Sequence, residues 1–155
     1  MSGVSIIQFT QDQVRTLTGV SSEAVRHWRK AVPYLSSKSG KVARFSFEDV
    51  IGLAVTLDIV HSLGVHIGTI SSGIDALFRL LSRIGPAASM SGTVLVTQAD
   101  AMLYKGEGRS FTLAAPAVIV PLEPFVTKIQ RQIMPTAKGP ASALRPLAQK
   151  LQRKA

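Results

Sequence analysis

Residues 9–50 decide the fold, and they have the sequence FTQDQVRTLTGVSSEAVRHWRKAVPYLSSKSGKVARFSFEDV. Thr10 and Gln13 are spaced as a capping box, in which two side chains satisfy backbone N–H groups at the start of a helix. Gly19 can adopt the backbone angles that end this helix, and one of the two serines after Val20 can cap the next. We therefore expect two short helices joined by a tight turn.

The second of these helices, from Glu23 to about Ala31, has two different sides. Its apolar residues, Ala24, Val25 and Trp28, share one side, where we expect burial. The remaining surface carries charged and hydrogen-bonding side chains: Ser22, Glu23, Arg26, His27, Arg29 and Lys30. A second helix with this surface suits the DNA major groove. The alternative is an ordinary helical hairpin with a solvated basic face.

A small basic hairpin is predicted next. Tyr34-Leu35 and Arg44-Phe45 have the character of two short strands around a polar loop that contains glycine. Lys38, Lys41 and Arg44 would place three cations where a wing can reach the DNA backbone. After this hairpin, Ser46 to Asp49 has capping-box spacing and opens an apolar, periodic stretch.

In this order, the motifs resemble the winged helix–turn–helix of MerR-type transcription regulators. Val25-Arg26-His27-Trp28 is similar to the Leu-Arg-Tyr-Tyr stretch of the family, and Phe45-Ser46 with Asp49-Val50 is similar to the end of its wing. The wing arginine of the family falls on Ala43 here, one residue before Arg44. The resemblance covers about residues 9–83. It implies a DNA-binding fold and a homodimer that forms through a helix beyond the DNA-binding unit.

Two longer helices are predicted after the wing. Apolar residues recur at helical spacing from Phe47 to Leu63, and Gly64 has the position of a C-terminal cap. A second apolar stripe extends from Ile67 to Ile84. His61 and His66 flank Gly64, and without cysteine or ordered carboxylates they make a poor metal site, so structural or solvent-exposed roles are favoured.

Residues 85–92 form a small-residue linker, and the periodicity changes after it. Short strands are predicted at 93–97, 101–105, 109–114 and 117–120, with a hairpin turn at 105–109. A helix follows, with Pro124 in its first turn. Its apolar side, which we expect to form the dimer contact, consists of Leu122, Phe125, Val126, Ile129 and Ile133. The alternative is that this helix merely covers its own small sheet. We favour a mixture of the two, an intrachain sheet whose helix or edge also forms the dimer contact.

The predicted architecture is mainly α with small β elements: a winged helix–turn–helix domain followed by a small α+β module. We place the DNA-binding domain at residues 1–84, the linker at 85–92, a dimerisation or effector module at 93–134 and a basic tail at 135–155. The tail can add phosphate affinity or act as a plain solubilising terminus.

Composition limits the functional classes. The net charge is +9, which favours a polyanionic partner. Cysteine is absent, so thiolate metal chemistry and disulfides are excluded. No signal peptide or membrane-spanning run is present in the sequence, and we expect a cytoplasmic, nucleoid-associated protein. No enzymatic constellation, metal site or cofactor motif is found, and we expect none.

The sequence thus predicts a homodimeric, sequence-specific regulator that binds double-stranded DNA. Its predicted DNA contacts are Ser22, Glu23, Arg26, His27, Lys30, Lys38, Lys41 and Arg44. One alternative is an excisionase-like architectural factor that bends DNA with the same fold. Another is a sensor whose 93–134 module binds a small molecule, although few convergent polar groups support such a pocket and no effector is identified.

Overall fold

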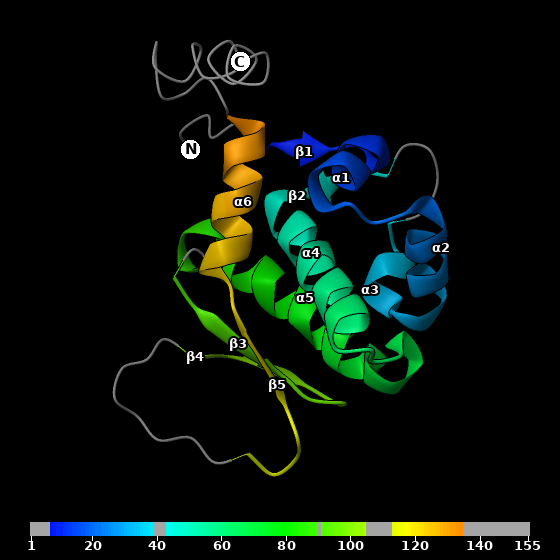
Figure 1. Cartoon of the computed structure of the whole chain (residues 1–155), viewed down its shortest axis with the longest axis vertical. Helices are drawn as coiled ribbons and strands as arrows, with labels where there is room; N and C mark the ends of the chain where they lie inside the picture. The colour runs from blue at the N-terminus through cyan, green and yellow to red at the C-terminus, as the bar shows by residue number, and fades with distance from the viewer. Residues whose placement is uncertain (1–6, 39–42, 90, 105–112, 135–155) are drawn as a thin grey trace, which may run out of the picture.

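The computed structural model describes residues 7–38, 43–89, 91–104 and 113–134, and it is mainly helical with two small antiparallel sheets (Figure 1). The helices of this part are α1 (Gln11–Thr18), α2 (Ser22–Ala31), α3 (Pro33–Ser36), α4 (Phe47–Ser62), α5 (Ile67–Ser89) and α6 (Glu123–Ile133). The strands are β1 (Gln8–Phe9), β2 (Phe45–Ser46), β3 (Thr93–Val96), β4 (Ala101–Tyr104) and β5 (Val118–Pro121). The predicted combination of helices with small β elements is confirmed at this level.

The two short helices joined by a tight turn that the sequence predicts at the start of the chain are present as α1 and α2. Thr10 and Gln13 form the expected capping box, with each side chain bonded to the backbone N–H of the other. Gly19 ends α1 in the left-handed region, at φ 80°. Ser21 caps α2 by accepting a hydrogen bond from the Ala24 backbone N–H at 3.0 Å. The turn is therefore built by residues whose chemistry suits it.

Helices α4 and α5 form the central helical pair of the fold (Figure 1). Ser46 and Asp49 make the predicted capping box at the start of α4. Gly64, at φ 65°, follows the C-cap of α4. The predicted end of the next helix at Ile84 coincides with a kink, because Gly85 has non-helical angles before a last helical turn.

The predicted hairpin strand at Tyr34-Leu35 is wrong. These residues belong to the short helix α3, which begins at Pro33 directly after α2. Phe45 does lie in a strand, but β2 pairs with β1 from the start of the chain, in the register Phe9 to Phe45. A short apolar pair such as Tyr34-Leu35 is compatible with either a strand or a short helix, so the apolar pattern did not distinguish them.

The second sheet has the strand order β4-β3-β5, with β3 antiparallel to both neighbours. The strands expected near 93–97, 101–105 and 117–120 are confirmed. Most of the strand predicted at 109–114, and the hairpin turn at 105–109, lie outside the described residues. The sheet packs on α5, where the Gly73 backbone N–H donates to the Gln98 carbonyl at 2.9 Å.

Helix α6 returns to the first part of the chain and packs against α4 and α1. Leu122, Val126 and Ile129 are at most 1% exposed within the single chain. They share one hydrophobic core with residues of α1, α4 and α5, while Phe125 and Ile133 pack against it half-buried. The apolar face that was predicted to form the dimer contact is therefore largely covered within the single chain, and a dimer contact through it stays a prediction. The two parts placed on either side of residues 85–92 share a core.

Among the described residues, no helix combines the length and the apolar composition that crossing a bilayer requires.

Candidate nucleic-acid interface

Helix α2 is anchored through one side. Val25 and Trp28 are 0% and 2% exposed, as the sequence predicts. Arg29, which was expected on the surface, is half-buried, and its Nη2 donates to Oε1 of Gln11 on α1 at 2.9 Å. Burial lowers the pKa of Arg29. The apolar contacts and this bond fix the orientation of α2 against α1 and the core.

The opposite side of α2 is a stripe of exposed, charged or titratable residues. Glu23, Arg26, His27 and Lys30 are all exposed, and their spacing of three, four and seven residues places them on one face of the helix. Ser22, at the start of the same helix, is half-buried. At 1.5 Å per residue the stripe is about 10 Å long. This matches about three steps of a B-DNA duplex, at 3.4 Å per base pair.

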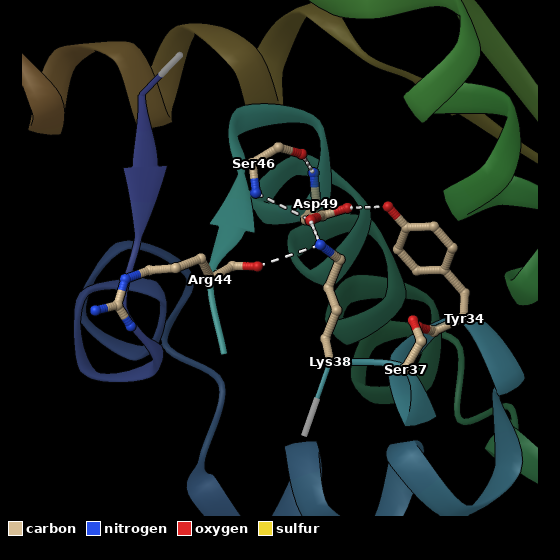
Figure 2. Close-up of polar contacts among 6 residues, drawn as sticks. All are labelled: Tyr34, Ser37, Lys38, Arg44, Ser46 and Asp49. Carbon is tan, nitrogen blue, oxygen red and sulfur yellow. Dashed lines mark hydrogen bonds and ion pairs between the residues drawn. The ribbon is translucent and has the colours of Figure 1, made fainter. Parts of the chain in front are cut away.

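Lys38 does not extend freely into solvent (Figure 2). Its Nζ lies 3.0 Å from Oδ2 of Asp49 and donates to the carbonyl of Arg44 at 3.2 Å. The side chain is 25% exposed. Lys38 therefore joins the two ends of the 38–44 segment to α4. Its phosphate contact stays a prediction, and the internal ion pair weighs against it.

Asp49 is the buried centre of this cluster, at 1% exposure. Besides the ion pair, its carboxylate accepts from the hydroxyl of Tyr34 at 2.6 Å and from the backbone N–H of Ser46 at 2.9 Å. A buried carboxylate is tolerable when it is paired and hydrogen-bonded in this way. Burial, followed by the hydrogen bond to Asp49, raises the pKa of Tyr34.

Tyr34 is also held from the side of α5. Its backbone N–H donates to Oδ1 of Asp75 at 2.7 Å, and its ring stacks on Phe78 with centroids 5.2 Å apart. The second Asp75 oxygen binds Arg79 at 2.8 Å. Two carboxylates from two helices thus hold the short helix that directly follows α2. Sequence reasoning found Asp49 as a cap but missed its role as an acceptor for Tyr34 and Lys38.

The remaining predicted wing cations are placed differently. Arg44 is exposed, and its Nη1 donates to the carbonyl of Ala43 at 3.1 Å. Figure 2 shows its guanidinium directed away from Lys38. Lys41 lies outside the described residues. Of the predicted wing cations that the structure describes, Arg44 lies at the surface and Lys38 is held in the ion pair with Asp49.

His61 and His66 are exposed, and within the described part of the chain no three histidine, aspartate or glutamate side chains gather as a metal site would require.

Comparisons of the chain with models of protein families, with curated protein sequences and with solved structures find no match.

Proposed function

We propose that this chain is a sequence-specific regulator that binds double-stranded DNA through α2, and that it acts as a homodimer. One observation carries the proposal. Val25 and Trp28 hold α2 from one side, and the other side presents Arg26, His27 and Lys30 in a single exposed stripe. Cations and hydrogen-bonding groups on the second helix of a helix–turn–helix suit base edges and phosphates of the major groove.

The parts of the surface have different tasks in this proposal. Residues at the start of α2 contact base edges, as the N-terminal residues of a recognition helix do. Lys30, Lys41 and Arg44 bind the flanking backbone and set the register without reading sequence. The net charge of +9 supports attraction to the polyanion. The resemblance to the MerR-type winged fold is part of the proposal, with Lys41 and Arg44 as its predicted wing contacts.

The test compares Arg26→Ala with Arg131→Ala, which removes an exposed arginine from α6. Helix α6 lies on the other side of α4 from α2 (Figure 1). A site is first selected from random duplexes with the native protein, and fluorescence anisotropy then gives the affinities. We expect Arg26→Ala to weaken specific binding by about 1–3 kcal/mol without changing the thermal melt, and Arg131→Ala to bind nearly as the native chain does. Equal loss in both variants would show that net charge alone drives binding, and it would reject α2 as the recognition helix.

The proposed homodimer is tested by a separate measurement of the mass of the chain in solution. Light scattering of the full chain at micromolar concentration should give twice the monomer mass, and the selected site should contain two half-sites. Half-sites of helix–turn–helix dimers are commonly about 34–36 Å apart, although MerR-type dimers distort the DNA between them. A monomer on a single half-site would reject this part of the proposal and leave the role of α2 intact.

A further inference from the structure

One residue of the exposed α2 stripe has the wrong charge for general phosphate attraction. Glu23 is the acid in a row that otherwise holds Arg26, His27 and Lys30. Within the described part of the chain, its carboxylate takes part in no ion pair or hydrogen bond. Arg26 is three residues away, at a spacing where helical ion pairs form, but it does not neutralise Glu23 here.

A favourable interaction with the helix dipole explains only part of the position of Glu23 on the exposed stripe of α2. A carboxylate in the first turn of a helix is stabilised by the helix dipole, and Glu23 has that position. The dipole does not require the carboxylate to lie on the same face as the three other stripe residues. On a surface that meets DNA, an unpaired carboxylate is repelled by every phosphate, so it must gain from a base what it loses to the backbone.

We propose that Glu23 is a specificity-determining residue that accepts a hydrogen bond from the N4 amino group of a cytosine in the major groove. This inference rests on the proposed function. Cytosine presents an N4 donor there, which a glutamate matches, whereas guanine presents two acceptors and thymine one, all of which repel a carboxylate. Adenine presents a donor beside an acceptor and is second best. Glu23 thus acts by rejecting wrong bases as well as by binding the right one.

The helix geometry adds a prediction about the neighbouring base. Glu23 and Arg26 are separated by about 4.5 Å along the helix axis, which is close to one base-pair step. Arg26 is suited to a bidentate contact with guanine. The half-site should therefore contain a cytosine and, about one step along, a guanine.

The experiment selects sites from random duplexes with the native chain, Glu23→Gln and Glu123→Gln. The last variant makes the same substitution in the first turn of α6, so it removes the same charge away from α2. We expect Glu23→Gln to lose a roughly 5- to 150-fold preference for cytosine at one position and to gain adenine, because glutamine pairs with the N6 and N7 atoms of adenine. Glu23→Ala should lose the cytosine preference without the gain, and Glu123→Gln should select the native site.

The outcomes distinguish a failure of the proposed Glu23 role from a failure of the proposed DNA-binding function. If Glu23→Gln selects the same bases as the native chain, the inference is overturned, while the DNA-binding function stands. If the native chain enriches no sequence at all, the proposed function fails and the inference fails with it. Thermal melts of both position-23 variants establish that a changed site does not reflect an unfolded helix.

Discussion

The ion pair between Lys38 and Asp49 makes a quantitative prediction about Lys38→Met. Methionine keeps the length of the side chain and removes the ammonium, so the carboxylate of Asp49 is left with Tyr34 and Ser46 as its donors. Removing one partner of a fully buried pair costs about 3–5 kcal/mol. Here a quarter of the Lys38 side chain is exposed, so water can replace part of the loss. We expect a cost of about 1.5–3 kcal/mol, the range for a hydrogen bond to a charged group.

Urea unfolding, monitored by tryptophan fluorescence, gives the unfolding free energy of each variant. Lys38→Met, Asp49→Asn and the variant with both substitutions then form a double-mutant cycle. The sum of the free-energy losses in the two single variants should exceed the loss in the double variant by about 1–2 kcal/mol, because the effects of substitutions at residues in direct contact are not additive. Lys128→Met is the matched control, since Lys128 is exposed on α6. Its unfolding free energy should change by no more than about 0.5 kcal/mol.

DNA binding separates the structural role of Lys38 from the predicted phosphate contact. If Lys38 serves the ion pair, Lys38→Met should keep the native salt dependence of the affinity. Loss of a phosphate contact would instead reduce the slope against salt by about one. A native unfolding free energy together with a reduced salt slope would refute the reasoning and return Lys38 to the backbone contacts.

Three further predictions concern stability. Trp28→Ala should lower the unfolding free energy by about 3–5 kcal/mol, because the indole is 2% exposed. Urea unfolding measured by circular dichroism checks this, and a loss below about 1 kcal/mol would contradict the burial. The raised pKa of Tyr34 means that the folded chain holds the phenolic proton more tightly than the unfolded chain does. The contribution of this proton to the unfolding free energy is therefore complete below about pH 10 and is lost as the pH rises further. Tyr34→Phe should lose less stability at alkaline pH than the native chain, and parallel curves of unfolding free energy against pH would contradict this. Gly73→Ala should destabilise by about 1–3 kcal/mol or more, since the added methyl would meet the backbone carbonyl of Thr97, whereas Gly68→Ala, which meets open space, should be tolerated in the same thermal melts.

Much of the helical part could be predicted because its signals are local. A capping box needs residues three apart, as Thr10 with Gln13 and Ser46 with Asp49, and a left-handed glycine such as Gly19 marks the end of a helix by itself. The exposed stripe on α2 also follows from periodicity, because Trp28 fixes which side is buried. These features need no knowledge of the rest of the chain.

The rest depends on partners far away in sequence. The backbone of Tyr34 bonds to Asp75 at a separation of 41 residues, and the local stretch alone did not distinguish a helix from a strand at Tyr34. Lys38 has the same appearance in sequence whether it faces DNA or Asp49. The apolar side of α6 was recognised, but periodicity does not say whether the covering partner is the same chain or a second copy.

The return of α6 to α1 has a consequence for synthesis on the ribosome. The side chain of Gln132 donates to the carbonyl of Leu17 at 3.4 Å, across 115 residues. At about 5–20 residues per second, helix α6 is made roughly 6–23 s after α1. During that interval the α1–α2 unit, and α4 once it has been made, lack the helix that closes their core. We therefore expect the nascent chain to offer an apolar surface to chaperones until its last described helix has left the exit tunnel.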